Sequence, residues 1–226
     1  TDIAADDFRI EIHASADGYY NSRQTTIVAL ADVLPAYPDL DDPQHRFLVF
    51  AHKNELWFGE IVTECDHTYV RHDAKPCRTS FSLSSRLSRG LVNLVTPAET
   101  LLDPCCGTGS ILLEAQSRGI QAYGADWNQT MVQMANENLS HFGYDERVEH
   151  ADARSYSQPA DAIVTDLPYG QFLQTDAAVI RAILEHGARL APVAVYVAGT
   201  LMTEWLETAG YHDLRVYPVV KRAGFV

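Results

Sequence analysis

The sequence predicts a doubly wound α/β domain that follows a small α+β module. After about residue 80, short apolar segments typical of strands alternate with segments whose apolar residues recur at helical spacing. Such alternation forms a mostly parallel sheet with helices on both faces and right-handed crossovers. The length of 226 residues allows one such domain and an accessory module. We therefore assign residues 1–70 to the module, 71–82 to a linker and 83–226 to the larger domain.

The module is predicted to have the order β-α-β-β. Residues 8–12 alternate apolar and polar side chains, as a half-buried strand does. Apolar residues at helical spacing place a helix within 25–34, and apolar runs predict strands at 46–50 and 56–62, joined by a turn at 52–55. Three strands and one helix bury only a small core. We therefore expect this module to depend on a neighbour.

The larger domain is predicted to begin with a helix that carries Leu83, Leu87, Leu91 and Leu94 on one face. Three later helices are expected to end at glycines, because glycine favours the first position after a helix; these are Gly119, Gly143 and Gly210, and a further helix contains Ile180, Ile183 and Leu184. We expect strands at 100–103, 121–126, 147–150, 161–166, 193–198 and 211–220, with a seventh beginning at 223.

Composition excludes several classes of protein. The chain has 17 basic and 30 acidic residues, a formal charge of −13, which argues against a general nucleic-acid coat. No apolar run reaches the ~18 residues of a membrane span. Four cysteines without a Cys-x-x-Cys pair argue against a zinc ribbon or a disulfide framework. We therefore expect a cytoplasmic protein with no metal and no membrane contact. Because the first residue is Thr, we expect that the chain was processed or cut from a longer one.

One stretch of the sequence is basic although the chain as a whole is acidic. Five basic residues lie between positions 71 and 89, where Asp73 is the single acid. They fit either a solvated linker or a collar that contacts phosphate groups. The five are Arg71, Lys75, Arg78, Arg86 and Arg89.

Four of the predicted strands end in an acid, namely Asp103, Asp126, Asp152 and Asp166. Ligands of doubly wound sheets bind beyond the carboxyl ends of the strands. Like charges gathered there are unfavourable unless a cation or hydroxyl donors accompany them. The pattern therefore predicts a ligand that is positively charged or rich in hydroxyl groups.

The turn after the first of these strands reads Asp103-Pro-Cys-Cys-Gly-Thr-Gly-Ser110. Gly107 and Gly109 allow the backbone to approach a ligand, and the amides of the next helix suit a carboxylate or phosphate. The position three past Gly109 is Leu112, so the dinucleotide pattern Gly-x-Gly-x-x-Gly is incomplete, and no P-loop lysine follows.

The next two strand ends suit a nucleoside. Asp126 is placed to accept hydrogen bonds from both ribose hydroxyls, Trp127 to cover an adenine face, and Asp152 to accept from an adenine amine. Alternatively, Trp127 packs on a helix and Asp152 is a turn residue. A nucleoside that bears a carboxylate satisfies the whole set, and S-adenosylmethionine is such a molecule.

The segment Thr165-Asp-Leu-Pro-Tyr-Gly170 follows the fourth strand. Pro168 fixes its φ angle and stiffens the loop. Asp166 and the Leu167 carbonyl can then accept two hydrogens from a planar amine, and Tyr169 offers a flat face on which a base can stack.

These motifs resemble those of Rossmann-like, S-adenosylmethionine-dependent amino-methyltransferases, and residues 75–220 are similar to the THUMP-domain tRNA guanine methyltransferases. The resemblance implies that the target amine is held by Asp166, Leu167, Pro168 and Tyr169. It implies that S-adenosylmethionine is held by Asp103, Cys106, Gly107, Thr108, Gly109, Asp126, Trp127, Asp152 and Ala153.

Three departures from the family pattern are visible. Leu167 stands where amino-methyltransferases commonly have Pro, and Thr79-Ser80 stands where a His-Pro pair is expected. Residues 8–62 fit only the rear part of a THUMP domain. Together with the acidic charge, this predicts that a partner subunit or a preceding segment supplies the RNA-binding surface.

We therefore expect an enzyme that methylates the exocyclic amine of guanosine in structured RNA, with tRNA as the first choice. The alternatives are a DNA adenine amino-methyltransferase and a non-catalytic cofactor-binding subunit. An NAD-dependent oxidoreductase is disfavoured by the missing third glycine.

Overall fold

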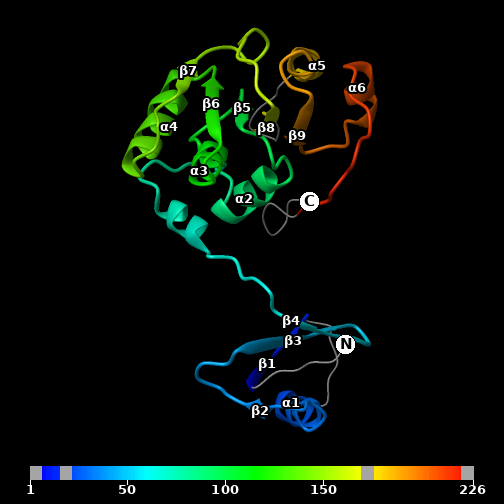
Figure 1. Ribbon diagram of the computed structural model, residues 1–226. Coiled ribbons are helices and arrows are strands. Elements are labelled where there is room, and N and C mark those ends of the chain that lie inside the picture. Colours follow the sequence, from blue (N-terminus) through cyan, green and yellow to red (C-terminus); the bar gives the residue numbers. More distant parts are fainter. Residues whose placement is uncertain (1–6, 16–21, 169–175, 220–226) are drawn as a thin grey trace. The chain divides into compact units, whose positions relative to one another are not determined.

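The computed structural model describes residues 7–15, 22–168 and 176–219 (Figure 1). The chain divides into two compact units, Thr1–Asp66 and His67–Val226. Each unit has its own sheet and its own apolar core.

The first unit is a four-stranded sheet with one helix against it. The strand order is β2-β1-β3-β4, in which β1 and β3 are parallel and β3 and β4 form an antiparallel hairpin. The elements are β1 (Asp7–Ala14), α1 (Arg23–Ala31), β2 (Tyr37–Pro38), β3 (His45–His52) and β4 (Glu55–Glu60). This confirms the predicted strands, helix and turn; only the two-residue β2 was not anticipated.

Alternation along β1 explains the core of this unit. Phe8, Ile10 and Ile12 are buried, and they pack with Phe47 and Val49 of β3. Half-buried residues of α1 cover this cluster. The helix begins after Ser22, whose hydroxyl accepts the Thr25 amide at 3.0 Å and so satisfies one free N–H of the first turn.

The second unit contains a five-stranded parallel sheet with the order β7-β6-β5-β8-β9. The chain starts at the centre with β5, adds β6 and β7 on one side, and then β8 and β9 on the other. The order therefore reverses between β5 and β8, which is the switch point where doubly wound sheets bind ligands. The strands are β5 (Thr100–Asp103), β6 (Gln121–Asp126), β7 (Val148–His150), β8 (Ala162–Asp166) and β9 (Val193–Val197).

Helices cover both faces of this sheet, as Figure 1 shows. Leu101 packs into the cluster shared by α2, α3 and α4, whereas the next residue, Leu102, packs on the opposite face with Ile163. The helices of the unit are η1 (Thr68–Ala74, a 3-10 helix), α2 (Ser85–Asn93), α3 (Ser110–Ser117), α4 (Gln129–His141), α5 (Ala177–Gly187) and α6 (Thr203–Thr208). The predicted doubly wound sheet is confirmed.

The prediction of a strand at 211–220 is wrong over the part that the structure describes. Residues 211–219 form no strand, and Val216 and Tyr217 are exposed. Alternating apolar residues suggested a strand, but Pro218 has no N–H to contribute to a ladder. Residue 220 and the start of a seventh strand at 223 lie outside the described residues.

The segment 71–82, predicted as a linker, instead belongs to the second unit, whose boundary lies at His67. The reason is a buried carboxylate on α3. Glu114 is fully buried; its Oε1 lies 2.7 Å from Nδ1 of the buried His72, and Arg89 Nε of α2 donates to its Oε2 at 2.7 Å. A buried carboxylate requires such partners, and they attach η1 and α2 to α3.

Glu114→Gln is predicted to destabilise the second unit by about 3–5 kcal/mol, because it leaves the Arg89 guanidinium buried without its charge partner. The free energy of unfolding of the larger unit, obtained from its urea-unfolding transition, measures this effect. Glu185→Gln, an exposed change on α5, is the matched control and should change stability little. Equal effects of the two substitutions would contradict the role given to Glu114.

Candidate cofactor-binding and active site

The carboxyl end of β5 places an acid at the centre of the sheet. Asp103 is 1 % exposed. Its Oδ1 accepts hydrogen bonds from the Thr165 hydroxyl of β8 at 2.6 Å and from the Cys105 amide at 3.2 Å. The pKa of Asp103 is raised to about 8, chiefly by burial and also by the nearby carboxyl groups of Asp166 and Asp126, although the hydrogen bonds from Thr165 and Cys105 oppose the shift. Asp103 is therefore largely protonated at pH 7.

The carboxylate of Asp126, at the end of β6, holds two turns together. Its Oδ2 accepts the Gly107 amide at 2.9 Å, and its Oδ1 accepts the Asn128 amide at 2.9 Å. Burial raises its pKa, while these two hydrogen bonds oppose that effect. Each carboxylate oxygen has two acceptor positions, so Asp126 retains one on each oxygen for an outside hydroxyl group.

The two glycines of the loop after β5 meet different requirements. Both have positive φ, +52° at Gly107 and +78° at Gly109, which side chains other than glycine rarely adopt. A Cβ at Gly107 would meet nothing within 4 Å, so open space adjoins it. A Cβ at Gly109 would lie 3.3 Å from Cβ of Ala135, so Gly109 also allows α4 to approach closely.

Two other residues of this loop turn their side chains into the protein. Cys106 is buried in the core beneath α3. Thr108 is also buried, and its hydroxyl oxygen lies 2.9 Å from the hydroxyl oxygen of Ser82. The Thr108 carbonyl accepts a hydrogen bond from Asn138 Nδ2 at 2.8 Å. The side chains of Cys106 and Thr108 are therefore buried rather than exposed at the open space beside Gly107.

The residues at the outer strands differ in exposure. Trp127 is 72 % exposed, so it does not pack on a neighbouring helix, and its carbonyl lies 2.8 Å from His150 Nε2. The Asp152 carboxylate accepts Arg154 Nε at 2.9 and 3.0 Å, and this arginine lowers its pKa. Ala153 is buried in the cluster with Leu167. Asp152 is thus already paired with a cation at the surface.

At the carboxyl end of β8, Asp166 is followed by a firmly anchored Leu167. The Leu167 amide donates to the Val197 carbonyl of β9 at 3.0 Å, and its buried side chain packs against Ile180 and Leu184 of α5. Tyr169 lies outside the described residues. The position commonly occupied by proline is therefore held in place by packing and a strand-type hydrogen bond.

Three of the four predicted acids meet at one edge of the sheet. The pairing of Asp103 with Gly124 aligns the ends of β5 and β6, and the Thr165–Asp103 hydrogen bond joins the ends of β5 and β8. Asp103, Asp126 and Asp166 consequently surround the switch point. Asp152, on the outer side of β6, stands apart with Arg154.

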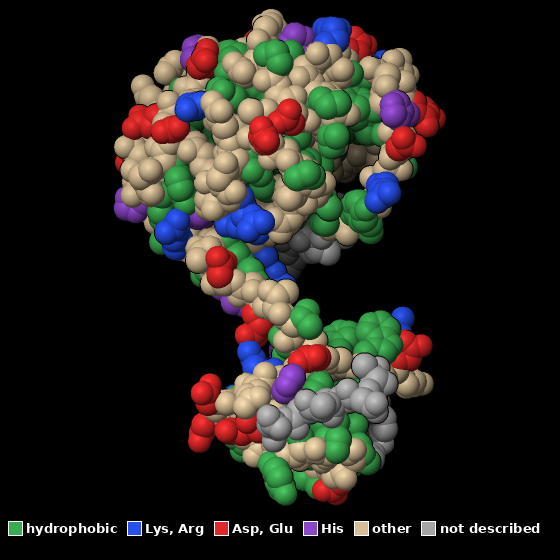
Figure 2. Space-filling model, viewed as in Figure 1, with side chains coloured by type: hydrophobic (Ala, Val, Ile, Leu, Met, Phe, Trp, Pro, Cys, Tyr) green, Lys and Arg blue, Asp and Glu red, His purple; other side chains and the backbone are tan. Residues whose placement is uncertain are grey.

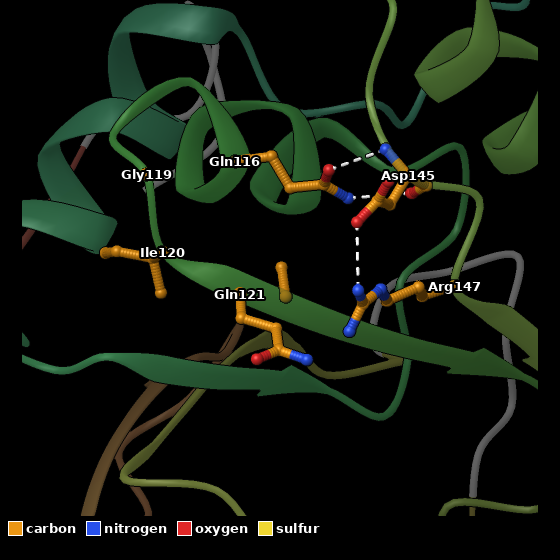
Figure 3. A pocket seen from close by; sticks show the side chains of 7 residues that line it. Gln116, Gly119, Ile120, Gln121, Asp145 and Arg147 are labelled. Atoms are coloured by element: carbon orange, nitrogen blue, oxygen red, sulfur yellow. Dashed lines mark hydrogen bonds and ion pairs between the residues drawn. The ribbon is translucent and has the colours of Figure 1, made fainter.

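A separate hollow of about 300 Å³ lies at the opposite ends of the strands (Figure 3). Its polar groups pair with one another. Gln116 exchanges two hydrogen bonds with the backbone of Asp145, and Arg147 contacts the Asp145 carboxylate at 2.9 Å. It faces the amino ends of β6 and β7, so it is distinct from the edge that carries the three acids.

Two residues of the basic stretch between positions 71 and 89 are withdrawn from solvent. Lys75 is buried and donates to the Ser110 hydroxyl at the start of α3. Arg89 is also largely withdrawn from solvent, at Glu114. The interpretation of this stretch as a solvated linker is therefore wrong for these two residues, and an exposed collar does not include them. Nothing in the local sequence distinguishes Lys75 from a solvated lysine, because its burial depends on contacts with a helix 35 residues away.

Residues 72–193 match the family model described as RMKL-like, methyltransferase domain. The chain belongs to this family. The matched region begins at His72 and includes Asp103, Asp126 and Asp166 at the sheet edge.

Named relatives of the domain act on RNA guanine. The chain is 44 % identical over 115 residues to a tRNA (guanine(10)-N2)-dimethyltransferase of Methanothermobacter thermautotrophicus, a match covering 49 % of this chain and 34 % of that protein. It is 29 % identical over 173 residues to the human U6 snRNA (guanine-N(2))-methyltransferase THUMPD2, covering 73 % of this chain and 32 % of that protein. The chain thus spans about a third of the length of these relatives.

Solved structures support the fold. TrmN from Thermus thermophilus matches with a TM-score of 0.51 and 23 % identity, over 92 % of this chain and 65 % of that one. A predicted N6-adenine-specific DNA methylase from Listeria monocytogenes matches with a TM-score of 0.53 and 14 % identity, over 90 % and 68 %. At these identities the likeness concerns the methyltransferase fold alone.

Two further observations concern the described part of the chain. None of its helices combines the length and the apolar character that crossing a membrane requires. Nor does that part gather three or more His, Cys, Asp or Glu side chains in a way that could hold a metal ion.

Asp103→Asn is predicted to flatten the dependence of stability on pH. The pKa of Asp103 in the folded state, about 8, exceeds the usual aspartate pKa of 3.8, so between these pH values the folded state binds a proton that the unfolded state does not. Stability therefore falls as pH rises through this window. We expect the free energy of unfolding of the unaltered chain to fall by about 1–3 kcal/mol more than that of the variant between pH 5 and pH 8.

Denaturant unfolding at both pH values measures this difference. Asp213→Asn, at an exposed turn of the same unit, is the control and should keep the slope of the unaltered chain. An unchanged slope in Asp103→Asn would show that the carboxyl group is ionised in the folded protein.

Proposed function

We propose that this chain carries out S-adenosylmethionine-dependent methylation of the exocyclic amine of guanosine in RNA, with tRNA as the expected substrate. The observation that carries this proposal is the meeting of Asp103, Asp126 and Asp166 at the switch point, beside the open loop at Gly107. The named activities of the relatives support the choice of guanine and of RNA.

The residues present fit the cofactor by their chemistry. Asp126 retains acceptor positions for two ribose hydroxyls, and the exposed Trp127 beside it offers a face for adenine. The Asp166 carboxylate suits the positive charge of a sulfonium or ammonium group, and a cation bound beside Asp103, which is largely protonated at pH 7, would favour the ionised form of its carboxyl group. Gly107, Gly109 and the backbone of Cys106 and Thr108 would line the amino-acid part, and Asp152 and Ala153 would lie at the adenine side.

The target amine would be held at the end of β8. The Asp166 carboxylate and the Leu167 carbonyl can accept its two hydrogens, and the anchoring of Leu167 between Val197 and α5 keeps these acceptors fixed. Pro168, which has no N–H, limits the motion of the segment. Tyr169 would stack on the base, which must leave its own stack to reach Asp166.

The cofactor, when bound, supplies an electrophilic methyl group, so that the N–C bond forms as the S–C bond breaks and the amine nitrogen then releases one proton to Asp166 or water. The chain supplies no covalent nucleophile in this scheme. Its contribution is to hold the two reactants in line and to stabilise the positive charge that develops on the nitrogen through the Asp166 carboxylate.

RNA capture needs more than this acidic chain provides. The net charge is −13, and Figure 2 shows acidic side chains on the visible face of each unit. We propose that the first unit is the rear part of a THUMP-like module, and that a partner subunit or another segment completes the RNA-binding surface. The four cysteines, all free of disulfides, support a cytoplasmic location.

Transfer of labelled methyl groups tests this function. With labelled S-adenosylmethionine and bulk tRNA at a concentration high enough to offset weak capture by this chain alone, tRNA should accept label in N2-methylguanosine, while duplex DNA at the same concentration should accept none. Asp166→Asn should lower kcat about 10²- to 10³-fold, because it removes the charge that stabilises the reacting nitrogen. Its affinity for S-adenosylhomocysteine should stay within about threefold.

Asp213→Asn is the matched control and should keep full activity. Label appearing in DNA adenine would overturn the choice of substrate. A parallel loss of S-adenosylhomocysteine affinity in Asp166→Asn would mean that Asp166 belongs to the cofactor site instead.

A further inference from the structure

Lys75 is a buried ammonium group with few partners. The residue is 5 % exposed, and the Ser110 hydroxyl accepts one of its three N–H groups. Within the described residues, no carboxylate forms a hydrogen bond or ion pair with it. Two N–H groups of a buried cation are therefore available for another acceptor.

The two carboxylates that attract Lys75 from a distance are engaged elsewhere. Glu114 is held by His72 and Arg89, each at 2.7 Å. Asp73 accepts the Ser85 amide at 3.0 Å, at the start of α2. Neither is positioned to neutralise the ammonium group directly.

The position of Lys75 is unfavourable for a cation on two counts. Burial and, to a smaller extent, the Arg78 guanidinium together lower the pKa of Lys75 to about 8. In addition, Ser110 is the first residue of α3, whose amino-terminal end carries partial positive charge. An anion bound at this point would be attracted by both the ammonium group and the helix end.

The position of Lys75 beside the glycine-containing loop indicates which anion would bind there. Ser110 directly follows the Gly107–Gly109 loop, with its open space at Gly107. The proposed cofactor carries a single anionic group, the carboxylate of its amino-acid part, and its cationic groups suit the acids across the loop. A phosphate within an RNA chain is bulkier and is linked on both sides, which suits an exposed cation better than a buried one.

We propose that Lys75 and the Ser110 hydroxyl form the subsite that binds the carboxylate of the S-adenosyl amino acid. This inference rests on the proposed function, because it takes the cofactor from it. Lys75 acts in binding and selects ligands that retain the carboxylate.

Calorimetric titration of the full chain with two ligands tests the subsite without any turnover. The ligands are S-adenosylhomocysteine and its decarboxylated analogue, which keeps the amine. The unaltered chain should bind the first about 10- to 100-fold more tightly, the range expected for a charge-assisted hydrogen bond. Lys75→Met should lose this preference by weakening only the first ligand. Lys53→Met, in the β3–β4 turn of the other unit, is the matched control and should keep the preference.

The outcomes separate the inference from the proposed function. Equal affinity of the unaltered chain for both ligands would overturn the carboxylate subsite, even if Lys75→Met failed to fold. Equal weakening of both ligands in Lys75→Met would show that the lysine only supports the loop. If the unaltered chain bound neither ligand, both the cofactor assignment and the subsite would fall.

Discussion

The crowding of three carboxyl groups at one sheet edge is the constraint on which the site depends. Like charges at the ends of adjacent strands destabilise a fold unless other groups compensate. Here the Thr165 hydroxyl and the Cys105 amide bind Asp103, while the amides of Gly107 and Asn128 bind Asp126. The same hydrogen bonds shape the loop after β5 and the turn before α4. The remaining negative potential suits a ligand with positive charge and hydroxyl groups.

A second polar arrangement lies around Glu114 and brings a cation to the helix that follows the loop. Glu114 of α3 draws His72 and Arg89 into the protein, which attaches the segment before α2 to this helix. That attachment carries Lys75 to the first residue of α3. Asp126 thus contacts the glycine-containing loop at Gly107, and Lys75 contacts Ser110 directly after that loop. A zwitterionic ligand can satisfy both groups together, which a simple cation or a simple anion cannot.

Local pattern predicted the parallel strands and the acids that end them, because parallel pairing and the placement of strand ends at one edge follow from the alternation of strands and helices. It did not predict what depends on distant residues. Glu114 lies 42 positions from His72 in the sequence. Because local pattern does not reveal this contact, the segment 71–82 was predicted to be a linker. Gly109 is required partly by Ala135, and Asp152 is already neutralised by Arg154. Residues 211–219 alternate like a strand, yet Pro218 interrupts the ladder they would need.

A crystal structure of the chain with S-adenosylhomocysteine bound tests the central claim most directly. The account predicts ribose hydroxyls on Asp126, the amino-acid part along the loop at Gly107, and the sulfur directed toward Asp166. Adenosine lodged in the hollow near Arg147, or outside the edge formed by β5, β6 and β8, would contradict it.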